Sequence, residues 1–274
     1  MRRSHRISRA TLAVAFALFA GAPLAAHDTW MLPAHAEAKA GDTMRLALTS
    51  GMAFPADETA IDGARVARGA VRLAGAEAPL TTQRKSEHAL ELEAVLAKPG
   101  VATLWLELHP RRIELDDEQV VEYLAEIGAE DSVRQRWQTM PAPRKWRELY
   151  AKHAKTFVRV GSAGEDRSWA QPAGMGLELV PEQDPTTLAS GDTLRVRLLR
   201  DGAPAGGLAV GLVRQGEAEG TLQKTDGEGR AAFRLQGEGW WLLRVTDLRP
   251  SELPETEWES DFTTLTVRTR PAPR

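Results

Sequence analysis

The chain has 274 residues, with 38 acidic against 35 basic side chains and a formal net charge of −3 at pH 7. This mild acidity argues against nucleic acid or an anionic membrane surface as the partner. The sequence contains no cysteine, which excludes disulfides and thiolate metal sites. The length fits one large domain or two small ones.

The first 26 residues have the pattern of a secretory signal peptide. Four arginines within the first nine residues precede the apolar run TLAVAFALFAGAPL, and the small residues Ala25 and Ala26 close it. The run is shorter than the about 20 residues that a helix needs to cross a bilayer, so we expect cleavage and no membrane insertion afterwards. Cleavage after Ala26 leaves 31 basic residues against 38 acids, a charge of −7, and makes His27 the first residue. A cut one residue earlier is the alternative. The pattern predicts a periplasmic protein that uses the general secretory route.

An internal repeat predicts the fold class. KAGDTMRLALTSG and ASGDTLRVRLLRDG, about 150 residues apart, share a Gly-Asp turn followed by alternating apolar residues. A second pair, PGVATLWLELHP and EGWWLLRVTDLRP, follows at similar distances. Two copies of one strand-turn-strand plan predict a mainly β protein of two immunoglobulin-like β-sandwich domains. In the second pair, the adjacent Trp240 and Trp241 must face opposite ways.

Between the two copies, the apolar spacing changes to a helical period. IELDDEQVVEYLAEIG offers Asp116 or Asp117 as an N-cap, with acids in the first turn and Gly128 as a stop. In the segment MPAPRKWRELYAKHAKTF, large side chains recur at helical spacing: Trp146, Leu149, Tyr150, His153 and Phe157. We therefore expect a helical pair that joins the two sandwiches.

These patterns divide the chain into five parts. The predicted parts are a signal peptide (1–26), an N-terminal β-sandwich domain (27–114), a helical connecting segment (115–160), a polar linker (161–174) and a C-terminal immunoglobulin or transthyretin-like β-sandwich domain (175–274).

His27 is the first candidate metal ligand. As an N-terminal residue it offers its α-amine and imidazole Nδ1, which together chelate one metal ion; a second imidazole would complete a histidine brace. The ordinary pKa of an α-amine is about 7.7–8.0, so a metal ion displaces its proton near neutral pH. Nitrogen ligands in a tetragonal arrangement suit Cu(II) or Ni(II). The alternative is that His27 is only a polar residue that the signal peptidase tolerates.

Three further residues are candidates to complete such a site. His153 lies on the apolar side of its predicted helix, His109 ends the LWLELH strand, and Asp247 ends the corresponding strand of the second copy. Each has a structural alternative: a hydrogen-bonded core histidine for His153, a solvent-facing side chain for His109, and a carboxylate that caps a turn for Asp247. No nucleophile elbow, phosphate loop or carboxylate pair on an apolar element predicts an enzyme; a copper redox enzyme is a minor possibility.

Several segments, taken in order, resemble a bacterial family of exported proteins of unknown function. They are AHDTWMLP, SGMAFPADETAID, ARVARGAVRLAG, IELDDEQVVEYLAEIG, RELYAKHAKTFV, WWLLRVTDLR and TEWESDFTTLTV. Members of this family are often described as periplasmic components of cobalt or nickel uptake systems. The resemblance implies a role for His27, since a histidine directly after the signal is characteristic of the family. Where related chains often have a histidine near the end of the last-but-one strand, this chain has Asp247.

Two functional hypotheses follow. In the first, the protein binds a Ni, Co or Cu ion through His27, with His153 or His109 completing the site, and delivers or buffers metal for an inner-membrane uptake system. In the second, it is a metal-free periplasmic adaptor whose exposed tryptophans contact protein or glycan.

Overall fold

The structure is a computed structural model that describes residues 27–217 and 220–272. The predicted signal peptide lies outside these residues. The described chain is mainly β, as predicted, with two α-helices and two short 3₁₀ helices, η1 (Gly63–Arg65) and η2 (Ser168–Ala170). No described helix has the length and apolar composition required to cross a bilayer.

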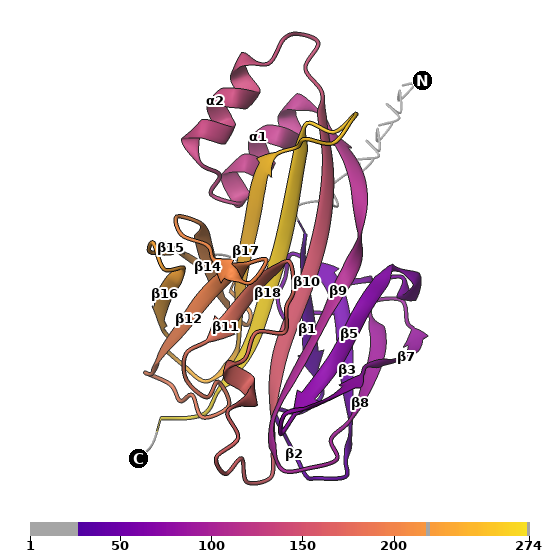
Figure 1. The fold of residues 1–274 in the computed structure, drawn as a ribbon, viewed down its shortest axis with the longest axis vertical. Helices are drawn as coiled ribbons and strands as arrows, with labels where there is room; N and C mark the ends of the chain where they lie inside the picture. The colour runs from indigo at the N-terminus through magenta and orange to yellow at the C-terminus, as the bar shows by residue number, and fades with distance from the viewer. Residues whose placement is uncertain (1–26, 218–219, 273–274) are drawn as a thin grey trace, which may run out of the picture.

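A nine-stranded sheet runs through the whole molecule (Figure 1). Its order is β15-β14-β17-β18-β10-β9-β5-β6, and the short β2 pairs with β10. Its strands are β2 (Glu37–Ala38), β5 (Val66–Leu73), β6 (Ala76–Pro79), β9 (Gly100–Leu115), β10 (Trp146–Val160), β14 (Ala209–Arg214), β15 (Thr221–Lys224), β17 (Gly239–Pro250) and β18 (Trp258–Thr269). The N-terminal and C-terminal halves meet where β10 and β18 pair in parallel.

Two smaller sheets pack on the large one. The first has the order β1-β3-β8-β7, with β4 paired to β3; the second has the order β11-β12-β13, with β16 paired to β12. Their strands are β1 (Asp28–Pro33), β3 (Thr43–Gly51), β4 (Thr59–Ala60), β7 (Thr81–Lys85), β8 (Leu90–Val95), β11 (Leu177–Pro181), β12 (Thr193–Arg200), β13 (Ala203–Pro204) and β16 (Arg230–Arg234). The repeated segments form β3 and β12, which confirms the strands predicted from them.

The two smaller sheets cover opposite faces of the large sheet. On β9, Leu104 and Leu106 pack into the core under the first small sheet. On β18, Leu265 and Val267 pack into the core under the second, whereas Thr266, which alternates with them, donates to the Met31 carbonyl of β1 at 2.8 Å. Because side chains alternate along a strand, one sheet serves two cores. The arrangement is of the β-sandwich kind.

The helices cover one end of the long strands (Figure 1). Helix α1 (Asp117–Glu126) begins at Asp116, whose carboxylate accepts from Gln119 N while the Gln119 side chain accepts from Asp116 N. This confirms the predicted N-cap. With α2 (Asp131–Thr139), it encloses an aromatic cluster between the helices and the sheet, formed mainly by Tyr123, Trp137, Trp146, Tyr150, Trp258 and Phe262.

The helix expected across RELYAKHAKTF is wrong: residues Trp146–Val160 form strand β10. This strand lies in the middle of the large sheet and is covered on both faces, so nearly all its side chains are buried, including Glu148, Lys152, His153 and Lys155. Because these four charged or titratable residues are buried, the strand lacks the alternation of apolar and polar residues by which a strand is predicted from sequence. These polar side chains form buried polar contacts in the sheet.

The predicted linker, 161–174, packs against the sheets rather than spanning open solvent. Its helix η2 contacts β5, β9 and β11, and Trp169, 7% exposed, belongs to the core of the C-terminal half. Trp240 and Trp241 face opposite ways, as predicted. Trp241 is buried in that core and donates to Thr269 Oγ1 at 3.0 Å, whereas Trp240 packs beside Trp30 on the other face.

The shared sheet leads us to expect one cooperative unfolding transition. Strand β10 pairs with β9 on one side and with β18 on the other, so neither half keeps its central sheet without the other. Scanning calorimetry checks this: the calorimetric and van't Hoff enthalpies should agree, and a fragment of residues 161–272 should be unfolded. Two separate transitions, or a folded fragment, would instead show independent domains.

Candidate functional site

His27 lies directly before β1 and is half-buried. Its backbone carbonyl accepts a hydrogen bond from Lys152 Nζ on β10. Its imidazole Nδ1 is buried and has no hydrogen-bond partner among the described residues. Burial, together with the Lys152 charge, lowers the pKa of His27 below its ordinary value, against the opposing carboxylates of Glu58 and Asp28. The neutral imidazole, which is the form that binds metals, therefore dominates at neutral pH.

A carboxylate that the sequence did not single out approaches His27. The pairing of Asp28 with Gly51 sets β1 beside the end of β3. Glu58 folds over this end: its Oε1 accepts from Met52 N at 2.8 Å, and a Cβ on Gly51 would lie 2.3 Å from Oε1. Gly51 is thus required for this close approach, and the Glu58 carboxylate lies near enough to His27 for its charge to act on the imidazole.

His153 lies on the opposite face of the large sheet from His27. Lys152, whose ammonium reaches His27, is its neighbour on β10, and adjacent side chains of a strand point to opposite faces. His153 Nε2 lies 2.9 Å from Asp261 Oδ1 and Nδ1 lies 3.2 Å from Glu107 Oε1, the latter an ionic contact without hydrogen-bond geometry. Burial opposes the imidazolium, but these two carboxylates outweigh it and raise the pKa of His153.

His109 and Asp247 do not join His27 either. The His109 side chain is exposed, and only its backbone carbonyl is engaged, by Arg65 Nη2 at 3.0 Å. The Asp247 carboxylate is buried and accepts from Arg200, with Arg249 3.5 Å away. Among the described residues, no group of three histidine or carboxylate side chains is arranged to hold a metal ion. A site made of His27, His153, His109 and Asp247 together therefore does not fit the structure.

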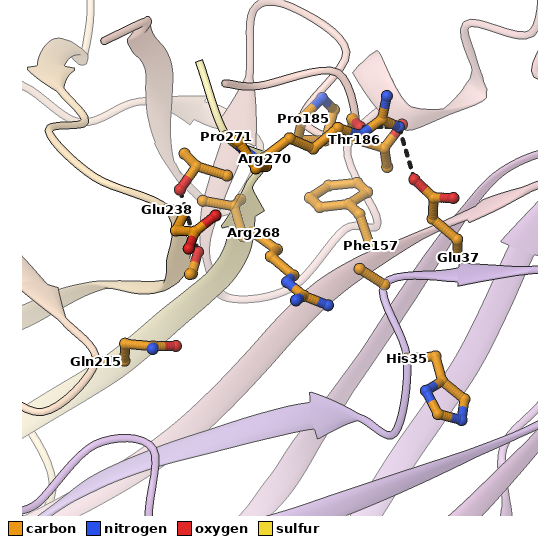
Figure 2. Close-up of a pocket in the computed structure, with 14 residues that line it drawn as sticks. His35, Glu37, Phe157, Pro185, Thr186, Gln215, Glu238, Arg268, Arg270 and Pro271 are labelled. Atoms are coloured by element: carbon orange, nitrogen blue, oxygen red, sulfur yellow. Dashed lines mark hydrogen bonds and ion pairs between the residues drawn. The ribbon is translucent and has the colours of Figure 1, made fainter. Parts of the chain in front are cut away.

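A separate groove lies between the two halves near the C-terminal end of β18 (Figure 2). It has a volume of about 570 Å³, and Arg268 extends into its middle (Figure 2). Its charges are largely compensated, because Arg270 pairs with Glu37 at 3.0 Å, and Arg268 stacks over Trp240 with its guanidinium 5.8 Å from the ring centre. It contains none of the predicted site residues.

The fold and these contacts define a mainly β protein of stacked sheets, in which the backbone carbonyl of His27 accepts from the buried Lys152. Residues 24–247 match the family described as Domain of unknown function (DUF4198), and the chain belongs to that family. No curated protein matches the sequence.

Solved structures with some likeness include adhesin InvE of Yersinia pseudotuberculosis, the ectodomain of mouse nectin-like molecule 4, and the FN1–FN3 domains of chicken CNTN1. Their identities to this chain are 12%, 8% and 8%, and their TM-scores are 0.23, 0.21 and 0.20. Each likeness covers 90% of this chain, and 59%, 65% and 69% of the other chain. The chain thus spans less than two thirds of the length of the adhesin and of the nectin-like ectodomain. At such low TM-scores the likeness carries no argument about this chain.

Proposed function

We propose that this protein is an exported, periplasmic metal-binding protein that takes one Ni, Co or Cu ion at His27. The ligands are the α-amine freed by cleavage after Ala26, imidazole Nδ1 of the same residue, and the carboxylate of Glu58. The observation that carries the proposal is the buried Nδ1 of His27, which has no hydrogen-bond partner among the described residues. A buried polar atom without a partner is costly, and a metal ion would supply the missing interaction.

The surroundings of His27 support a fixed chelate. Lys152 Nζ holds the His27 carbonyl, so the residue that carries both nitrogen ligands is anchored to the central strand. The Glu58 carboxylate binds the Met52 and Ala53 amides through Oε1 alone, which leaves Oε2 for a metal ion. Two nitrogens and one carboxylate oxygen suit a divalent transition metal, with water or a partner's ligand completing the coordination.

We further propose that the bound ion is delivered to, or buffered for, an uptake system in the inner membrane. A site with only three protein ligands suits a carrier, because an incomplete coordination shell allows a partner to take over the ion. We propose no enzymatic activity.

The test uses protein purified from the periplasm without an N-terminal tag. Intact mass should show a start at His27, and titration calorimetry should show one bound Ni or Cu ion. His27→Ala should weaken binding by more than about 100-fold, because even changes to groups that only support a metal ligand cost 10–100-fold. A form that keeps one extra residue before His27 should lose affinity too, since acylation removes the amine.

The matched control is His35→Ala, which removes an exposed histidine close to the other end of β1. Its affinity should equal that of the unaltered protein. If His27→Ala binds metal as well as His35→Ala does, the proposal is wrong. If a protein that starts at His27 binds none of the three metals, the metal-free adaptor becomes the better hypothesis.

A further inference from the structure

A second cavity, of about 400 Å³, opens between the first small sheet and the strands β9 and β10. It lies where the β9–β10 register shifts between Tyr150 and Lys152. Its lining contains five basic residues and a single acid. The basic residues are Arg65, Lys85, Arg111, Arg112 and Lys152, and the acid is Asp62.

None of these five cations forms an ion pair with a carboxylate in the described part of the chain. Lys152 is 3% exposed, and its ammonium donates only to the His27 carbonyl. Arg65 donates through Nη2 to the His109 carbonyl, while its Nε is buried without a partner. The one acid, Asp62, already accepts from Ala64 N at 2.9 Å as the N-cap of η1.

Elsewhere, partly buried cations of this protein do have carboxylate partners. Arg159 pairs with Asp184 at 2.8 Å, and Arg244 pairs with Asp28 at 2.7 Å. The cavity therefore concentrates basic side chains that form no ion pair among the described residues, and carboxylates that act on Lys152 from a greater distance, such as Asp28, lie outside its lining. A buried cation without a counter-charge costs free energy that a bound anion would recover.

The lining also offers the geometry to hold an anion. Arg65 and Lys152 both lie over the Tyr150 ring, each with its charged group 5.6 Å from the ring centre. Arg111, which is opposite Tyr150 in the β9–β10 pairing, stands at the rim as an exposed arginine. Its neighbour Arg112 donates to Thr256 Oγ1 at 2.6 Å. A guanidinium group binds a carboxylate through two parallel hydrogen bonds.

We propose that this cavity binds a small organic anion with two or three carboxylate groups. One carboxylate occupies the inner end, between Arg65 and Lys152, and another meets Arg111 at the rim. A volume of about 400 Å³ has room for such a molecule, and the spread of the cations from the interior to the rim favours several anionic groups over one. This site does not depend on a metal ion at His27.

The probe is citrate, with inorganic phosphate and sulfate as comparison anions, titrated by calorimetry at low salt. Because citrate also chelates metals, the titration is repeated on metal-free His27→Ala protein, where it should give the same 1:1 affinity. Arg65→Gln should weaken citrate binding by more than tenfold, and Arg111→Gln, at the exposed rim, by about tenfold. Higher salt should weaken binding further.

Arg45→Gln is the matched control, because Arg45 is an exposed arginine of β3 that pairs with Glu93 outside the cavity. It should bind citrate as the unaltered protein does. Absence of saturable citrate binding, or equal affinity in Arg111→Gln and Arg45→Gln, overturns the proposal. Tighter binding of phosphate or sulfate than of citrate overturns the assignment to carboxylates. Binding that disappears in His27→Ala would place citrate on a metal ion instead of in this cavity.

Discussion

Glu178→Ala is expected to destabilise the protein by about 3–5 kcal/mol, because it leaves the buried ammonium of Lys155 without its counter-charge. The two side chains are 2% and 1% exposed, and Lys155 Nζ donates to the Glu178 carboxylate and, at 3.1 Å, to the Leu179 carbonyl. The carboxylate also accepts from the amides of Ala173 at 2.6 Å and Gly174 at 2.9 Å. One carboxylate thus joins β10, β11 and the segment that precedes β11.

Urea unfolding of paired variants separates the charge from the hydrogen bonds. Lys155→Met alone leaves a buried carboxylate unpaired, whereas Lys155→Met combined with Glu178→Gln leaves no charge and keeps one acceptor oxygen, which at the Oε2 position accepts from the Gly174 and Met175 amides. The double variant should therefore be more stable than Lys155→Met. Arg84→Ala, which breaks the exposed pair with Glu91, is the control and should leave the urea midpoint almost unchanged. A Glu178→Ala variant as stable as Arg84→Ala would contradict the assigned role.

His153→Gln should cost about 3 kcal/mol near pH 6 and change the pH dependence of stability. The imidazolium joins Glu107 on β9 to Asp261 on β18, and is 4% exposed. Arg68 also binds Glu107, and Arg249 binds Asp261 at 2.8 Å. Replacement therefore removes the central cation of a chain of charges that spans five adjacent strands of the large sheet, from β5 to β17.

The sign of the pH effect follows from the pKa shifts. The pKa of His153 is raised in the folded protein above 6.5, so its contribution is complete below pH 6.5 and is lost as pH rises through the raised value. Although burial alone would raise it, the pKa of Glu107 is lowered to about 2, by His153, Arg68 and the Gly176 amide. The contribution of Glu107 to folding stability is therefore present above pH 4.5 and is lost as the pH falls toward 2.

Thermal unfolding between pH 5 and pH 9 tests this. The unaltered protein should lose stability as pH rises above 6.5, and His153→Gln should show a flatter profile over the same range. His35→Gln, which replaces an exposed histidine, should keep the profile of the unaltered protein. An unchanged slope in His153→Gln would show that other groups cause the pH dependence.

Local sequence patterns were sufficient to predict those strands and helices that bury only one of their faces. Strands β3 and β12 show the alternation that follows from one face in a core and one face toward solvent, and α1 carries its own cap at Asp116. His27 could be named as a candidate ligand because it directly follows the predicted signal peptide, and no information about its surroundings was needed. Each of these features depends on residues that are close together in the chain.

Only the tertiary structure shows which polar side chains are buried together and which residues surround His27. Strand β10 is covered on both faces, so polar side chains such as Lys155 and His153 are buried beside partners more than 20 residues away, and no local period reveals that pairing. For the same reason the sequence did not indicate Glu58 beside His27, or the five cations that line one cavity. Alternation along β10 places Lys152 and His153 on opposite faces, which is why the predicted ligands do not meet at a single metal ion. The sequence by itself determined the strand class and the first candidate ligand, whereas the side chains that surround that ligand depend on strand pairing between distant segments.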